Sequence, residues 1–212
     1  MEKSIVLNKL ASVQGRRDEI PNIEFAKEIA IDENLTALQI IINEIFITKN
    51  SKIQNDCIKV VYELGELKPA MLTPYFQDFL KLLSHKNNRL QWGGMLALYY
   101  VSVSQPKLIY SAIPKIVETA EKGSVITKDG AVNILIEMAK TETYKDDMLS
   151  LLKELMLKSP TNQLPMYAER AYPVIDEKNK KQFAEMLQVR LNEIEKESKK
   201  KRVEKIINKL MK

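Results

Sequence analysis

The chain has 212 residues, of which 45% are hydrophobic and 29% are charged, and its formal net charge is +5. This is ordinary for one globular domain with or without a tail, and a core of this size needs no disulfide or metal for stability. One cysteine, Cys57, excludes an intrachain disulfide, and one cysteine with one histidine excludes a Cys/His zinc site, so we expect no metal and no cofactor.

The first segment in chain order, MEKSIVLNKL, is charged from its second residue and has no long apolar run, so it does not read as a signal peptide. The longest uncharged apolar runs, such as MLALYYVSV, are far shorter than the roughly 20 residues of a membrane-spanning helix. We therefore expect a cytoplasmic protein without an integral membrane segment.

Helical spacing of apolar residues then predicts a series of helices. Residues 24–30 and 34–47 form a first pair; the second segment contains the β-rich IIINEIFI, but its place in the series favours helix. Further helices are predicted within 69–83, 106–120 and 143–157. Between them lie segments that repeat with a period of 37 residues, at 51–69, 88–106, 126–140 and 164–176.

The repeated segments share a column of small residues on an apolar helical face, which lets a neighbouring helix approach closely. Each segment also begins near a polar residue that can cap a helix. Ser51 with Gln54 reads as a capping box, and Asn88 with Gln91 is its counterpart 37 residues later. Ser124 and Thr161 are the candidate caps of the next two helices. The small residues are Cys57, Gly94, Ala131 and Ala168.

Paired helices at a fixed period make an α-solenoid, and residues 34–176 resemble the HEAT-repeat (armadillo-like) family. Pro74 and Pro114 match the proline inside that family's first helix. Gln54 and Gln91, each after an aliphatic residue, stand where the family has a Val-Arg pair. The resemblance implies an all-α fold, a right-handed α-solenoid of HEAT-like helix pairs. We predict a repeat domain over 1–176, a capping helix over 177–198 and a basic, partly amphipathic tail over 199–212.

One predicted helix is apolar on two sides. Opposite its packing stripe it carries Trp92, Leu96, Tyr99 and Val103, where the neighbouring repeats are mostly polar. The resemblance implies that these residues and Tyr62 lie on the concave face, and we call the five of them the aromatic patch. Three interpretations stay open: a surface covered by the chain's own helices, a binding site for a protein or peptide, or a site for a small molecule or nucleobase.

Four other features have a structural interpretation beside a functional one. His85 reads as a solvated loop residue rather than a general base, and Cys57 as a buried, inert thiol. Asp129 and Glu137 read as a solvated helix face rather than a carboxylate pair. The stretch GRRDEIPN reads as a helix connection, in which Arg16 and Arg17 are candidates for contact with an anionic partner.

The excess positive charge lies at the C-terminal end. Residues 176–212 hold 12 Lys+Arg and 7 Asp+Glu, so the rest of the chain is neutral. The basic cluster consists of Lys199, Lys200, Lys201 and Arg202, which are secondary candidates for partner contacts. After it comes an apolar stripe with no obvious repeat to pack on. We expect this stripe either to fray beyond the capping helix or, more than the rest of the tail, to seek a partner.

These features favour a non-enzymatic scaffold that binds a protein or peptide through the aromatic patch. The alternative is a nucleic-acid-binding protein, because some HEAT-like proteins are DNA glycosylases that use a Trp and an Asp, for which Trp92 and Asp129 are candidates. The zero net charge of residues 1–175 argues against nucleic-acid binding, since phosphate binding needs clustered Lys and Arg on the contacting face. A homodimer through the aromatic patch or the C-terminal helix is a further candidate assembly.

Overall fold

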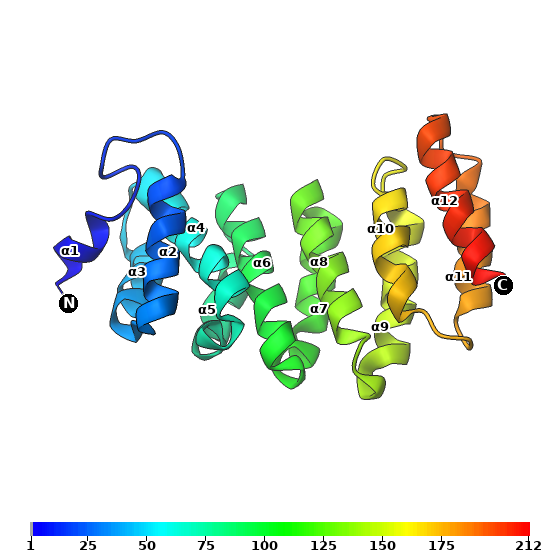
Figure 1. Cartoon of the computed structure of the whole chain (residues 1–212), viewed down its shortest axis with the longest axis horizontal. Helices are drawn as coiled ribbons and strands as arrows, with labels where there is room; N and C mark the ends of the chain where they lie inside the picture. Colours follow the sequence, from blue (N-terminus) through cyan, green and yellow to red (C-terminus); the bar gives the residue numbers. More distant parts are fainter. Residues whose placement is uncertain (1) are drawn as a thin grey trace. The chain divides into compact units, whose positions relative to one another are not determined.

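The computed structural model describes residues 2–212, which hold helices and no strand (Figure 1). Short 3₁₀ helices, η1 and η2, accompany α5 and α10. The bounds are α1 Lys3–Leu7, α2 Ile20–Asp32, α3 Leu35–Ile47, α4 Ser51–Leu67, η1 Pro69–Tyr75, α5 Phe76–Leu82, α6 Asn88–Ser104, α7 Pro106–Lys122, α8 Val125–Met138, α9 Glu142–Lys158, α10 Leu164–Ala171, η2 Tyr172–Val174, α11 Lys180–Leu191 and α12 Glu197–Leu210. None of the described helices is long and apolar enough to cross a membrane.

The chain divides into two compact units, residues 1–131 and 132–212. In the first unit α2 packs on α4 and α4 on α6, while α3 packs on α4, and η1, α5 and α7 pack on α6 (Figure 1). In the second unit α9 packs on α11, and α12 packs on both α10 and α11. The predicted helices and the all-α solenoid class are therefore confirmed.

The column of small residues lies in the core, and one of its members marks a close helix contact. Cys57, Gly94, Ala131 and Ala168 are all buried. A Cβ at Gly94 would lie 2.7 Å from the Cβ of Leu82 and 3.2 Å from the carbonyl oxygen of Phe79. Because neither atom can rotate away, α6 can pass α5 at this distance only with glycine at this position.

The neighbouring Gly93, which the repeat pattern did not explain, serves a different contact. A Cβ there would lie 2.4 Å from Cγ1 of Ile58 on α4. One repeat later, a Cβ at Gly130 would lie 2.7 Å from Cγ of Met95 on α6. Ile58 and Met95 are 37 residues apart, as are the two glycines. α6 and α8 therefore each receive a long side chain, from α4 and α6 respectively, over a glycine.

Gly94→Ala is expected to lower the free energy of unfolding by about 2–3 kcal/mol, because the added methyl group meets atoms fixed to the backbone of α5. The matched control is Gly130→Ala, which meets Cγ of Met95 at the same 2.7 Å, but in an unbranched side chain that can change rotamer. We therefore expect a smaller loss for the control. Urea unfolding followed by circular dichroism measures both, and equal losses would contradict this account of the α5–α6 contact.

The predicted capping boxes are wrong, because the N-caps lie one residue earlier. Asn50 accepts a hydrogen bond from the backbone N–H of Lys52 (3.0 Å), and Asn87 accepts one from Arg89 (2.9 Å). Gln54 instead donates to the carbonyl of Ile45 (2.9 Å) at the end of α3. Gln91 donates to the carbonyl of Leu83 (2.9 Å) after α5. Gln54 thus bonds α4 to the end of α3, and Gln91 bonds α6 to the end of α5.

Of the next two predicted caps, one is confirmed and the other is wrong. Ser124 accepts a hydrogen bond from the backbone N–H of Thr127 (3.3 Å), as a cap of α8 should. The cap predicted at Thr161 is wrong, because α10 begins only at Leu164 and its N-cap residue is Gln163. Pro165 at the second position of α10 favours the start of the helix. A proline lacks the backbone N–H, and an N–H in the first turn would have no intrahelical partner.

A buried arginine closes the end of α9. Arg190 of α11 donates from Nη1 to the carbonyls of Met156 and Leu157 (both 2.7 Å) and from Nη2 to that of Ser159 (2.9 Å). Its Nε pairs with Glu193 (2.8 Å). A helix leaves its last carbonyls without intrahelical partners. One guanidinium therefore satisfies the C-terminal end of α9 and joins it to α11.

The apolar stripe of the last segment is covered. α12 packs on α10 and α11, so the stripe has a surface to pack on although it lies outside the 37-residue repeat. α12 thus packs within its own unit, and the division into a capping helix over 177–198 and a separate tail over 199–212 stays a prediction. The buried side chains are Val203, Ile206, Ile207 and Leu210.

Candidate functional site

The residues of the aromatic patch lie along one face of α6 and on the adjoining part of α4. Trp92, Leu96 and Tyr99 are half-buried and Val103 is exposed, whereas Tyr62 is buried, with 8% of its surface accessible. The rings of Tyr62 and Trp92 contact each other in a tilted arrangement with centroids 5.4 Å apart. The structure thus brings Tyr62 and Trp92 together and leaves a partly open apolar strip beyond them. That this face is the concave one stays a prediction.

Two cations lie over these rings. The guanidinium of Arg89 is 5.7 Å from the Trp92 ring centroid, and Nζ of Lys59 is 4.9 Å from that of Tyr62. Glu19, at the start of α2, pairs with both Arg89 and Lys59, the latter at 3.4 Å. Lys59 also pairs with Glu63 at 2.5 Å. The Tyr62–Trp92 end of the patch is therefore bordered by an ion-pair cluster that holds the two aromatic rings.

The sequence held a partial signal for this cluster. Lys59 precedes Tyr62, and Arg89 precedes Trp92, by three residues, which places each pair on one helix face. Glu19 gave no signal, because it is 40 or more residues from its partners along the chain and its role depends on how α2 packs on α4.

The charges of the cluster stabilise one another. Burial raises the pKa of Glu19, but the hydrogen bond and charge of Arg89 and the charge of Lys59 outweigh it, and the pKa lies below its ordinary value. Burial lowers the pKa of Arg89, yet its bond to Glu19 leaves the pKa raised. Burial also raises the pKa of Tyr62, so its hydroxyl stays protonated at neutral pH.

Glu19→Gln is expected to lower the free energy of unfolding by about 1 kcal/mol at pH 7, a small value because the side chain is 38% exposed. The pKa of Glu19 is lowered in the folded state, so its contribution is present above the ordinary value of 4.5 and is lost as the pH falls through the folded pKa. Urea unfolding at pH 7 and near pH 3 should show the difference between variant and wild type shrinking. Glu24→Gln, on the exposed face of α2, is the control and should change little; a pH-independent difference for Glu19→Gln would contradict the role of this pair.

A pocket of about 370 Å³ adjoins the cluster, and we call it the loop pocket. It lies between the connection from α1 to α2 and the first turns of α4 and α6. Asp56 of α4 holds this connection by accepting hydrogen bonds from the backbone N–H of Ser12 (2.7 Å) and from Nδ2 of Asn22 (2.8 Å). The lining residues are Ala11, Ser12, Gly15, Arg16, Arg17, Asp18, Glu19, Lys52, Asn55, Asp56 and Arg89.

Residues 15–19 of the stretch GRRDEIPN form the predicted helix connection, whereas its last three residues begin α2, and both arginines line the loop pocket. Arg16 is occupied by a bidentate pair with Asp18 (2.9 and 3.0 Å), whose pKa this hydrogen bond holds below its ordinary value. Arg17 is exposed and has no partner among residues 2–212. Of the two arginines, Arg17 is the one available to a ligand.

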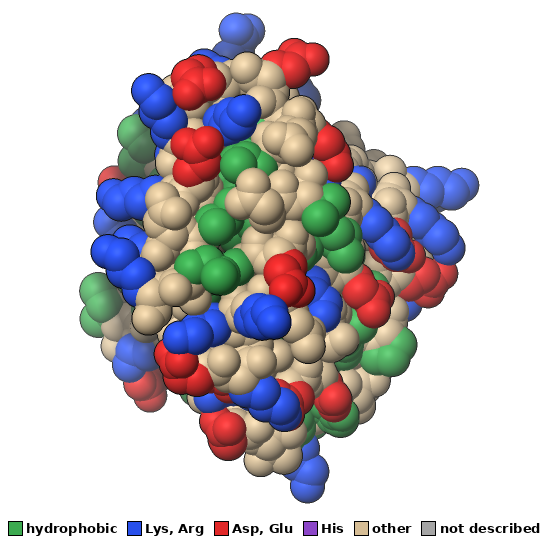
Figure 2. Space-filling view, turned by 90° about the vertical axis from the view of Figure 1, so that its right-hand side faces the viewer, with side chains coloured by type: hydrophobic (Ala, Val, Ile, Leu, Met, Phe, Trp, Pro, Cys, Tyr) green, Lys and Arg blue, Asp and Glu red, His purple; other side chains and the backbone are tan. Residues whose placement is uncertain are grey.

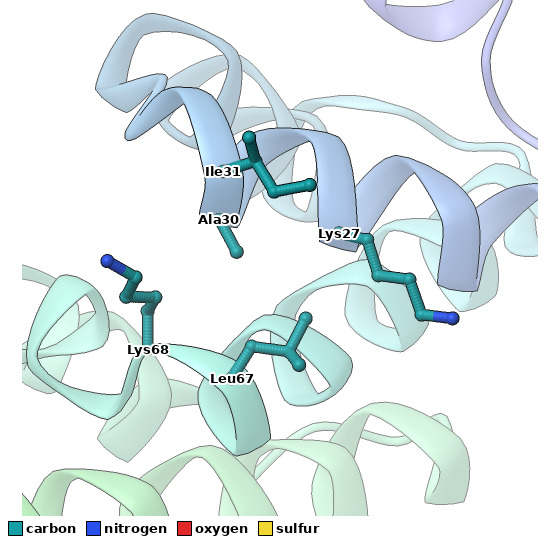
Figure 3. A pocket seen from close by; sticks show the side chains of 5 residues that line it. All are labelled: Lys27, Ala30, Ile31, Leu67 and Lys68. Atoms are coloured by element: carbon teal, nitrogen blue, oxygen red, sulfur yellow. The ribbon is translucent and has the colours of Figure 1, made fainter.

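Another pocket of about 370 Å³ lies between the C-terminal ends of α2 and α4 (Figure 3). Ala30, Ile31 and Leu67 form its apolar surface, and Figure 3 shows the side chains of Lys27 and Lys68 leading away from it on opposite sides. Ile31 is 80% exposed. Lys68 pairs with Glu33 (2.9 Å). This second pocket is an open apolar depression without convergent polar groups.

The remaining candidates have structural surroundings. Nδ1 of His85 accepts a hydrogen bond from the backbone N–H of Asn87 (3.0 Å) and so shapes the turn before α6. Cys57 is buried, and burial raises the pKa of its thiol, which keeps it unreactive. On α8, Glu137 pairs with Lys140 (2.6 Å), and Asp129 is half-buried. No group of three or more residues of the described chain could hold a metal ion.

The basic cluster of the C-terminal end lies on α12. Arg202 forms a bidentate pair with Glu169 (2.6 and 2.8 Å), and Lys199 donates to Oδ1 of Asn162 (2.7 Å). Lys200 is half-buried and Lys201 is exposed. Figure 2, which faces the end that holds α11 and α12, shows basic and acidic side chains interleaved with hydrophobic groups. Two of the four basic residues thus have partners within the chain.

The paired helices and their 37-residue repeat place the protein in the class of armadillo- or HEAT-like helical-repeat folds. No protein-family model and no curated protein sequence matches the chain.

Several solved structures are similar in fold. An engineered protein has a TM-score of 0.62 at 15% identity, over 97% of this chain and 96% of that one. A crystal structure of computationally designed armadillo repeat proteins for modular peptide recognition has 0.62 at 14% identity, over 99% of each chain. A designed armadillo repeat protein has 0.59 at 13% identity, over 99% and 100%. At these identities the likeness establishes the fold alone.

Proposed function

We propose that this protein is a non-enzymatic, cytoplasmic helical-repeat scaffold that binds a protein or peptide through the aromatic patch. The observation that carries the proposal is the partly open strip of Trp92, Leu96 and Tyr99 on α6, next to the cation–aromatic cluster. Aromatic and arginine side chains supply much of the energy at protein interfaces. Rings that are held in place lose little conformational entropy when a partner binds.

The fold supports the same use of this face. Helical-repeat proteins stack their helices into extended surfaces, on which a segment of a partner can lie across several helices. One of the similar structures is a set of designed armadillo repeat proteins for modular peptide recognition. The ion pairs of Glu19 with Arg89 and Lys59 border the apolar strip with charge, as the polar rim of an interface does.

A peptide selection tests the proposal directly. Peptides from a phage-displayed random dodecapeptide library, selected against the full-length chain, should alter the fluorescence of Trp92, the only tryptophan of the chain. The emission should shift to shorter wavelength as the bound peptide covers the ring. A selection that enriches no peptide, or peptides that bind without changing this emission, would contradict the proposal.

Two further measurements separate the competing uses of the surface. A DNA oligonucleotide should leave the Trp92 emission unchanged at about 0.15 M salt; salt-sensitive binding there would instead support the nucleic-acid alternative. Sedimentation of the wild type and of Trp92→Ala tests whether a second copy of the chain occupies the aromatic patch. A dimer that Trp92→Ala dissociates would make self-association the function of the patch.

A further inference from the structure

The loop pocket carries positive charge that the chain itself does not neutralise. Its three acidic residues are all engaged: Asp18 with Arg16, Glu19 with Arg89 and Lys59, and Asp56 with Ser12 and Asn22. Arg17 and Lys52 also line the pocket, and neither side chain has a partner within residues 2–212. The pocket therefore presents two cations without ion-pair partners, and its lining carries one net positive charge, from four basic side chains against three acidic ones.

Buried polar atoms point to the same conclusion. Nε of Arg89 and Oγ of Ser12 are both buried, and neither has a hydrogen-bond partner in the described chain. Both residues line the loop pocket. Buried polar groups in native proteins are nearly always satisfied, so two orphaned ones in a single pocket need an explanation. An acceptor group held beside these two residues is one such explanation.

The helix ends strengthen the local field. Lys52 and Arg89 occupy the second positions of α4 and α6, and they are equivalent residues of the 37-residue repeat. Neither helix has an acidic residue in its first turn. The N-terminus of a helix carries partial positive charge and favours an anion, whereas a basic side chain there opposes the helix dipole. A negatively charged ligand in the pocket would offset both sources of positive charge.

The pocket and the aromatic patch are continuous through one side chain. Arg89 lines the loop pocket, and its guanidinium lies over the Trp92 ring at 5.7 Å. A partner that covers Trp92 and extends past the N-terminus of α6 therefore reaches the loop pocket next. The three acidic residues of its lining make the pocket unsuitable for a polyanion such as nucleic acid, whereas two unpaired cations match a single carboxylate.

We propose that the loop pocket binds an acidic side chain, Asp or Glu, of the same peptide whose apolar residues contact the aromatic patch. This inference rests on the proposed function and adds the chemistry of the partner: an acidic residue next to aromatic or aliphatic ones. Arg17 and Lys52 bind the carboxylate, and Arg89 contacts both parts of the peptide.

The test uses a selected peptide and its neutral analogue, in which each Asp or Glu is changed to Asn or Gln. Fluorescence anisotropy measures both against the full-length chain, the double variant Arg17→Gln/Lys52→Gln, and the control Lys27→Gln/Lys107→Gln. The control removes the same charge from exposed lysines that do not line the loop pocket. Both variants change only exposed side chains, so the fold is retained.

We expect the wild type and the control to bind the acidic peptide about 10-fold more tightly than the neutral analogue. In Arg17→Gln/Lys52→Gln this ratio should fall to about 2 or below, while affinity for the neutral analogue is unchanged. Equal binding of both peptides by the wild type, selected peptides without a recurring acidic residue, or a ratio that survives in the double variant would each overturn the inference. The proposed function would survive these results, because it fails only if binding ignores the aromatic patch or if no peptide binds.

Discussion

Replacing Arg190 with methionine is expected to lower the free energy of unfolding by about 3–5 kcal/mol. Arg190 is 6% exposed, and its guanidinium donates to three carbonyls at the end of α9. Methionine has similar length but no donor, so the three carbonyls lose charge-assisted hydrogen bonds in a place that water reaches poorly. Urea unfolding of the full-length chain, followed by circular dichroism, measures the loss.

Two variants sharpen this result. Arg190→Lys should lose most of the same energy, because one ammonium group cannot match the fork of a guanidinium that contacts three carbonyls. Arg202→Met is the control, since Arg202 lies in the same unit but pairs with Glu169 at an exposed site, and its loss should be at most about 1 kcal/mol. If Arg190→Met cost no more than Arg202→Met, the connection between α9 and α11 would not depend on this side chain.

Trp92→Ala is expected to weaken binding of a selected peptide about 30-fold, the effect of losing roughly 2 kcal/mol at an interface hot spot. The variant should keep its helix content, and its free energy of unfolding should fall by less than the about 3–5 kcal/mol of a fully buried aromatic residue, since Trp92 is half-buried. Isothermal titration calorimetry and circular dichroism measure the two quantities.

Tyr110→Ala is the matched control for this second result, because Tyr110 is an exposed aromatic residue of α7 outside the aromatic patch. It should leave peptide affinity within about two-fold of the wild type. Equal affinities for Trp92→Ala and the wild type would place the peptide elsewhere. A loss of folded protein in Trp92→Ala would make Trp92 a core residue.

The helices could be predicted from the sequence because their apolar residues recur at helical spacing and the recurrence itself repeats every 37 residues. The caps were harder. Asn50 and Asn87 precede residues that also cap well, and Gln54 and Gln91 follow at the spacing of a capping box. Only the structure shows that these glutamines bond to the preceding helix, because that choice depends on where the end of that helix lies.

The candidate site was predictable only where it depends on a single helix. The strip from Trp92 to Val103 follows from one helix alone, and the structure gives it partial exposure. Burial of Tyr62 depends on the α4–α6 contact, and the role of Glu19 depends on the packing of α2 on α4. The stripe of α12 was visible, but the surface beneath it belongs to α10 and α11 and has no counterpart in the repeat.

The contacts of Ile58 over Gly93 and of Met95 over Gly130 make α6 both the receiver and the source of the same kind of fit, whereas α4 has Asp56 and α10 has Tyr167 at the glycine position. α6 carries a recess on one side and a projecting residue on the other, two positions apart, so it is complementary to a copy of itself. An added helix with the sequence of α6 would therefore meet α6 through the same glycine recess and projecting side chain.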